Sequence, residues 1–183
     1  MQQLHSPWRH LFPGIQHLSQ AGQVWLDSAA TAQKPQVMLD ALLQHYQQGV
    51  ANVHRAQHQP GERATIAFEQ ARQQAAHWLN APSSDCILFT KGATEGINLL
   101  SHALAGQLKA GDEILLSGYE HHANLLPWQH LVQRQQLQLK ILPVDNHGTI
   151  EIAHAADYFN SRTRLLAISP LSNVLGQLHY LVC

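Results

Sequence analysis

Residues 89–100 read Phe-Thr-Lys-Gly-Ala-Thr-Glu-Gly-Ile-Asn-Leu-Leu, a pattern that changes from an apolar strand to the start of a helix. The apolar run Cys86–Phe89 has the length of a buried strand, and Gly92 supplies the backbone freedom of a tight turn. Apolar residues then recur at helical spacing. Because the first amides of a helix lack internal partners and the helix dipole is positive there, Ala93 and Thr94 form a candidate phosphate site. The alternative is an ordinary turn in which Thr94 only caps the helix.

Composition limits the class of protein. A chain of 183 residues with 45% hydrophobic content suits one globular domain, or one domain and part of a second. A net charge of -1 gives no electrostatic argument for nucleic acid or a membrane surface as a partner. The chain has no apolar run of about 18 residues, and its first 15 residues lack the apolar centre of a secretory signal. We therefore expect a soluble, cytoplasmic protein. Since Cys86 falls in a predicted buried strand and Cys183 is the last residue, no disulfide framework is expected.

Strands and helices alternate along the chain. Apolar runs predict strands at 24–26, 86–89, 113–117, 137–144 and 165–169. Helical spacing and end signals predict helices at 35–49, 62–80, 94–108, 125–134 and 151–159. This alternation predicts an α/β fold with a mostly parallel sheet.

Three polar residues each follow the carboxyl end of a predicted strand: Thr94, His121 and Asn173. Parallel α/β sheets bind ligands at that edge. An imidazole can stack on an aromatic ring, and an asparagine amide can meet a phenolate or carboxylate oxygen. Their joint position predicts a site for an aromatic phosphate ester. Taken singly, His121 and Asn173 also fit a local hydrogen bond and a turn.

Other ligand classes fit the sequence less well. Neither the Gly-x-Gly-x-x-Gly dinucleotide pattern nor the Gly-x-x-x-x-Gly-Lys-Ser/Thr phosphate loop occurs. Zinc could be sought at His54 with His58, or at Glu120 with His121 or His122. Neither group has a third and fourth ligand at a recognisable spacing, so no metal site is predicted.

With these residues in hand, the chain resembles the amino-terminal part of SufS/CsdA-type cysteine desulfurases of the class V aminotransferase superfamily. These are pyridoxal 5'-phosphate (PLP) enzymes of fold type I. The resemblance runs in the family's order through LDSAATAQKP at 26–35, NVHR at 52–55, GATEGINL at 92–99, EHHANLLPW at 120–128, TRLLAI at 163–168 and SNVLG at 172–176. It implies an incomplete three-layer sandwich, truncated within the large domain. The implied parts are an amino-terminal arm at 1–22, a partial large cofactor-binding domain at 23–176 and a divergent tail at 177–183.

The resemblance also implies roles for individual residues. Thr94 and the neighbouring Ala93 would hold the cofactor phosphate, although the family usually has a second threonine where Ala93 stands. His121 would stack on the pyridine ring and assist proton transfer, and Asn173 would contact the cofactor or the substrate. Four further residues would lie beside the substrate, the last two of them near a dimer partner: Ala29, Ala30, His54 and Arg55.

The implied activity is conversion of L-cysteine to L-alanine with sulfur transfer to an enzyme cysteine, for iron-sulfur cluster assembly. The implied partners are a homodimer partner and a sulfur-acceptor protein. The family's Schiff-base lysine and nucleophilic cysteine have no counterpart in the sequence, so we expect this chain alone to be inactive. Two alternatives stay open. One is another class V enzyme, such as a selenocysteine lyase or a kynureninase-like protein. The other is a non-catalytic remnant that binds a phosphorylated ligand or a full-length subunit.

Overall fold

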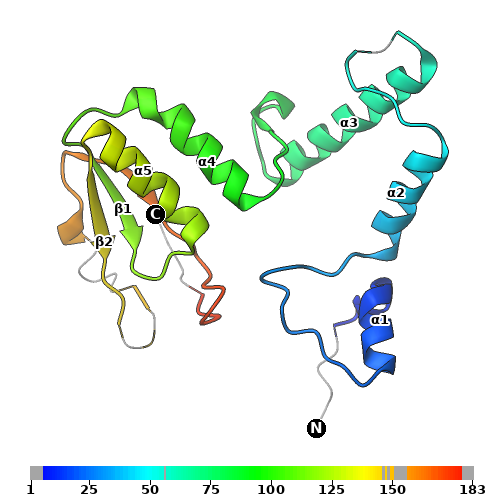
Figure 1. Ribbon diagram of the computed structural model, residues 1–183, viewed down its shortest axis with the longest axis horizontal. Coiled ribbons are helices and arrows are strands. Elements are labelled where there is room, and N and C mark those ends of the chain that lie inside the picture. The colour runs from blue at the N-terminus through cyan, green and yellow to red at the C-terminus, as the bar shows by residue number, and fades with distance from the viewer. Residues whose placement is uncertain (1–5, 56, 146, 148, 151–155, 179–183) are drawn as a thin grey trace. The chain divides into compact units, whose positions relative to one another are not determined.

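The computed structural model describes residues 6–55, 57–145, 147, 149–150 and 156–178 (Figure 1). The chain divides into two compact units, with the boundary between Leu88 and Phe89.

The first unit is helical. Its elements are η1 (Arg9–Leu11), α1 (Pro13–Gln20), α2 (Gln36–Gln47), α3 (Gln59–Trp78) and η2 (Ser84–Cys86). The helices predicted at 35–49 and 62–80 are confirmed as α2 and α3. Helix α3 begins three residues earlier than predicted because the His58 side chain caps it: Nδ1 accepts from the Gly61 amide at 3.2 Å. A side-chain acceptor at this position satisfies an amide that the helix leaves unpaired.

The strands predicted at 24–26 and 86–89 are wrong. Residues 24–26 form no strand, and Leu26 is 88% exposed. Ile87 has an extended backbone, with φ -102° and ψ 122°, but no described strand pairs with it. Cys86 lies in η2 and is exposed, so its placement in the core is also wrong. An apolar run supplies strand propensity, whereas a strand also needs a neighbouring backbone to pair with its amides and carbonyls.

The second unit contains a three-stranded sheet. Its strands are β1 (Glu113–Ser117), β2 (Gln138–Leu142) and β3 (Thr163–Ala167), in the order β2-β1-β3. Both pairings are parallel, with Leu115 opposite Lys140 on one side and Leu166 on the other. All five residues of β1 are buried, as expected for a central strand covered on both faces. The predicted α/β class, the parallel sheet and these three strands are confirmed.

The helices of the second unit precede the first strand or connect the strands. They are α4 (Ala93–Leu104), η3 (Ala105–Gln107), η4 (His122–Asn124), α5 (Leu126–Gln135) and η5 (Ala156–Tyr158). The helices predicted at 94–108 and 125–134 are confirmed in type, although the first continues as η3 after Leu104. The helix predicted at 151–159 falls mainly outside the described residues, and Ala156–Tyr158 forms a short 3-10 turn.

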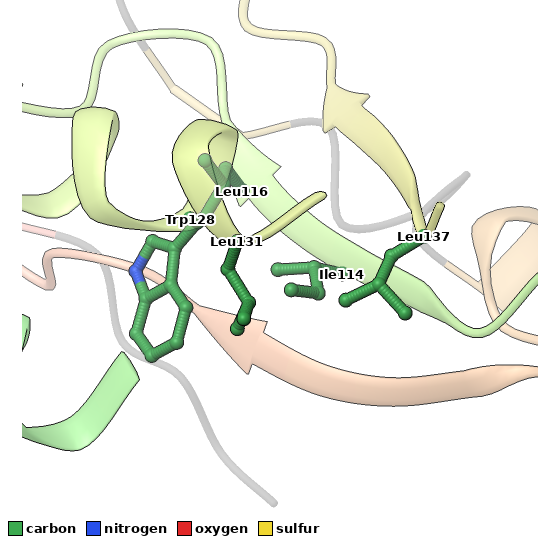
Figure 2. Packing of buried hydrophobic residues seen from close by; sticks show 5 residues of the cluster. All are labelled: Ile114, Leu116, Trp128, Leu131 and Leu137. Atoms are coloured by element: carbon green, nitrogen blue, oxygen red, sulfur yellow. The ribbon is translucent and has the colours of Figure 1, made fainter. Parts of the chain in front are cut away.

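Alternation along β1 divides its side chains between two apolar clusters. Ile114 and Leu116 pack with Trp128 and Leu131 of α5 and with Leu137, which precedes β2 (Figure 2). The other face of the strand carries a second cluster of Leu115, Leu142 and Ile150. The first cluster fixes α5 over the sheet, and therefore fixes the chain between β1 and α5.

A buried carboxylate marks the amino end of β1. The Glu113 side chain is 0% exposed, and its Oε2 accepts from Asn160 Nδ2 at 2.8 Å. Lys140 Nζ lies 3.1 Å from Oε2, and Arg162 lies 3.2 Å from Oε1. Burial acts to raise the pKa of Glu113, but the hydrogen bonds and the two positive charges outweigh it and hold the pKa below 4.5. The folded state therefore favours the ionised form.

This lowered pKa makes a prediction for the pH dependence of stability. A carboxyl whose folded pKa lies below its unfolded value stabilises the protein above the unfolded pKa, and that contribution is lost as the pH falls through the folded pKa. Glu113→Gln should lower the free energy of unfolding at neutral pH, and its difference from wild type should shrink as the pH falls below 4.5. Urea unfolding over this pH range measures the difference. A difference that stays constant with pH would contradict the prediction.

Candidate functional site

The start of α4 presents free backbone donors. Gly92, its N-cap, has φ +141° and ψ 177°, and no side chain caps the helix. The first helical bond in this turn runs from the Gly96 amide to the Gly92 carbonyl. The structure shows no hydrogen bond from the amides of Ala93 or Thr94 to any described residue. These two donors and the exposed Thr94 hydroxyl are the groups that a phosphate would bind.

His121 lies in the turn that follows β1. It is the N-cap of η4, where its Nδ1 accepts from the Ala123 amide at 3.0 Å. The Asn124 amide donates to the His121 carbonyl at 2.8 Å and closes the same turn. An imidazole nitrogen that accepts a hydrogen bond carries no proton, so neutral His121 holds its proton at Nε2.

Thr94 and His121 line one hollow of about 360 Å³ in the second unit. The other residues that line it are Asn98, His122, Ala123, Leu126, Pro127 and His130. The structure thus brings together two of the predicted site residues, and Ala93 is adjacent to one of them. Sequence reasoning missed Asn98, although it lies one helical turn after Thr94 and its Nδ2 donates to the Thr94 carbonyl at 2.8 Å.

Asn173 does not line this hollow. It is exposed in the turn after β3, where Ser172 Oγ accepts from the Val174 and Leu175 amides at 3.3 and 3.1 Å. Because β3 is the parallel neighbour of β1, Asn173 and His121 both follow the carboxyl ends of adjacent strands. The predicted contact of Asn173 with a cofactor or substrate stays a prediction.

The predicted substrate-proximal residues belong to the first unit. Ala29 and Ala30 form an exposed turn after Asp27. His54 has a left-handed backbone with φ +63°, and its Nε2 lies 3.0 Å from Glu69 Oε1. Arg55 is exposed in the same turn. The proximity of these four residues to substrate, and of His54 and Arg55 to a dimer partner, stays a prediction.

Sequence reasoning also missed the hydrogen bonds made by Glu120, the residue before His121. Its carboxylate accepts from Ser117, Asn124 and Ser169, which come from β1, η4 and the segment after β3. The signal available in the sequence was an acidic residue three positions after the end of a buried strand. A sequence does not show which donors from later segments reach such a residue.

Two negative findings concern only the part of the chain that the structure describes. No group of three or more His, Cys, Asp or Glu side chains there is placed to hold a metal ion. None of the helices in that part is both long and apolar enough to cross a membrane.

Residues 24–182 match the family model described as aminotransferase class-V. The chain belongs to this family. A relative from Pseudomonas aeruginosa, named a probable cysteine desulfurase, is 57% identical over 173 residues, which are 94% of this chain and 43% of the relative. A cysteine desulfurase from Synechococcus elongatus is 43% identical over 154 residues, covering 84% of this chain and 25% of that protein.

Solved structures agree with this class V assignment. The cysteine desulfurase CsdA from Escherichia coli superposes with a TM-score of 0.79 at 36% identity, over 97% of this chain and 44% of that one. The apo cysteine desulfurase from Thermococcus onnurineus gives a TM-score of 0.85 at 31% identity, over 98% of this chain and 44% of that one. The resemblance to cysteine desulfurases and to their PLP fold is confirmed. The chain spans about 43% of the length of its Pseudomonas relative.

Proposed function

We propose that this chain is the PLP-binding part of a cysteine desulfurase, an enzyme that converts L-cysteine to L-alanine and transfers the sulfur to an enzyme cysteine. The observation that carries the proposal is the shared hollow of Thr94 and His121. The hollow combines a helix start that can bind an anion with an imidazole that can lie against a ring. PLP, the cofactor implied by the class V family, has a phosphate for the first group and a pyridine ring for the second.

The donor set of the hollow fits the phosphate of PLP. The amides of Ala93 and Thr94 and the Thr94 hydroxyl would hold it, and each is a donor that suits an oxyanion. Ala93 contributes only its amide. We therefore expect phosphate affinity in this chain to depend on the Thr94 hydroxyl more than in relatives with a second hydroxyl.

His121 fits the ring end of the cofactor. When bound, PLP withdraws electrons from the α-carbon of an amino acid substrate. His121 would lie against the pyridine ring and hold or move a proton at Nε2, since its Nδ1 is occupied by the Ala123 amide. Asn173 would contact the cofactor or substrate. Ala29, Ala30, His54 and Arg55 would lie near the substrate.

The remaining functional features are proposals for the whole protein. The whole protein would be a cytoplasmic homodimer. It would act on L-cysteine or selenocysteine and would pass sulfur to an acceptor protein in iron-sulfur cluster assembly. None of the four lysines, Lys34, Lys91, Lys109 and Lys140, lines the hollow of Thr94 and His121. We therefore propose that the 183-residue chain alone does not turn over cysteine.

A PLP titration of the 183-residue chain tests the proposal. We expect saturable binding, seen as a shift in cofactor absorbance, that Thr94→Val weakens by about tenfold or more because one charge-assisted hydrogen bond is worth roughly 1.5–3 kcal/mol. Thr94→Ser keeps the hydroxyl and should retain most of the affinity. His121→Ala should also weaken binding, whereas His77→Ala, an exposed histidine of the first unit, should not. Absence of binding by wild type, or equal binding by Thr94→Val, would overturn the proposal.

A further inference from the structure

The Glu120 carboxylate is saturated with hydrogen bonds. Oε1 accepts from the Ser117 hydroxyl at 2.5 Å and from the Ser169 amide at 2.8 Å. Oε2 accepts from Asn124 Nδ2 at 2.8 Å and from the Ser169 hydroxyl at 2.6 Å. The four donors come from the end of β1, from η4 and from the segment after β3, so one side chain joins three parts of the sheet edge.

The direction of these bonds is fixed by groups that can only donate. The Trp128 indole Nε1 donates to Asn124 Oδ1 at 3.0 Å, and an indole nitrogen cannot accept. Asn124 must therefore turn its Nδ2 toward Glu120, where it needs an acceptor. The Ser169 backbone amide is likewise a donor only. Each Glu120 oxygen thus faces one donor that cannot be reversed.

The same bonds reach His121. Asn124 donates through its side chain to Glu120 and through its backbone to the His121 carbonyl, at 2.8 Å in both cases. Within that turn the Ala123 amide donates to His121 Nδ1. The position of the His121 ring and the choice of its proton-bearing nitrogen therefore depend on a turn that Glu120 holds.

We propose that Glu120 is a positioning residue for His121: its four hydrogen bonds fix the turn in which the Ala123 amide holds His121 Nδ1 and leaves the proton at Nε2. This inference rests on the proposed function, because it assigns to Glu120 the orientation of the imidazole that would meet the cofactor ring.

Glutamine cannot replace the carboxylate. If the amide oxygen of Glu120→Gln takes the Oε1 position, its NH2 group faces the Asn124 donor. If the oxygen takes the Oε2 position, the NH2 group faces the Ser169 backbone amide. The two serine hydroxyls can turn and accept, but in either orientation one donor is set against another, and a donor left without an acceptor is costly.

The experiment uses the isotope-labelled 183-residue chain without cofactor and has two readouts. Long-range proton-nitrogen spectra report which His121 nitrogen is protonated, with the signal assigned by its loss in His121→Gln. Amide hydrogen exchange reports the bond from Ala123. Wild type should show the Nε2-protonated form. Glu120→Gln should show a mixture of both forms and exchange at Ala123 that is faster by about tenfold, the effect of losing one hydrogen bond of roughly 1.4 kcal/mol.

Glu113→Gln is the matched control, because it makes the same chemical change at a carboxylate at the amino end of β1, whereas Glu120 lies beyond the carboxyl end of that strand. It should destabilise the fold and leave both His121 readouts unchanged. If Glu120→Gln does not fold, Ser169→Ala removes one hydroxyl donor and keeps the carboxylate, and it should change both readouts in the same direction by less.

Three results would overturn the inference. They are a wild-type His121 protonated at Nδ1, a folded Glu120→Gln with unchanged readouts, and equal changes in Glu113→Gln. Neither readout involves PLP. The inference about Glu120 can therefore be wrong even if the wild-type chain binds PLP, and it can be right even if the chain does not bind PLP.

Discussion

Leu116→Ala is expected to lower the free energy of unfolding of the second unit by about 2–5 kcal/mol, because truncation of a buried leucine loses transfer free energy and leaves a cavity. Leu116 is fully buried on β1 and packs in the cluster of Ile114, Trp128, Leu131 and Leu137 (Figure 2). Since β1 is the central strand, little backbone movement can refill the space. Urea unfolding followed by tryptophan fluorescence measures the effect, because Trp128 lies in the same cluster.

Leu175→Ala is the matched control. It makes the same chemical change in the second unit at a side chain that is 55% exposed, so its effect should stay within about 0.5 kcal/mol. Equal losses of unfolding free energy in the two variants would show that Leu116 does not lie in a packed core. The cluster around Leu116 could then not be what stabilises the parallel sheet.

Gly92→Ala and Gly96→Ala should change stability in opposite directions. A side chain at Gly92 meets no atom within 4 Å, so the cost comes only from its φ of +141°, a conformation nearly confined to glycine. We expect Gly92→Ala to destabilise by about 1–3 kcal/mol. Gly96 lies within α4, and a Cβ there would make ordinary contact with Thr90 Oγ1 at 3.6 Å. Alanine at Gly96 should stabilise by about 0.5–1 kcal/mol.

Thermal unfolding of the two variants beside wild type checks the sign of each change. The two variants add the same methyl group at nearby positions, so a difference in their stability reports the difference in backbone conformation. A Gly92→Ala variant that is more stable than wild type would show that Gly92 does not have a positive φ in the turn before α4. The exposed amides of Ala93 and Thr94 would then no longer be supported as a phosphate site.

How much of the fold the sequence predicted depends on the kind of element. The strand β1 was predicted with the right bounds, because the apolar run Ile114–Leu116 at its centre is typical of a strand buried on both faces. Similar runs at 24–26 and 86–89 predicted strands that do not form. The two cases have the same local pattern, and they differ in whether a described strand pairs with them in parallel.

The candidate site divides in a similar way. Thr94 and His121 could be predicted from their positions after glycine and after a strand, and the structure places both on one hollow. The two bonds of Glu120 from Ser169 could not be predicted, since Ser169 lies 49 residues away and approaches only because β3 pairs with β1.

Local periodicity, turn residues and motif order are therefore enough to predict the α/β class, the helix start at Ala93 and Thr94, and the family. Three features emerge only when the chain is folded: which apolar runs become strands, which residues share the hollow with His121, and which distant donors reach Glu120. The physical reason is that hydrogen bonds between strands and contacts across a sheet edge join residues far apart in the chain, and no local pattern records their partners.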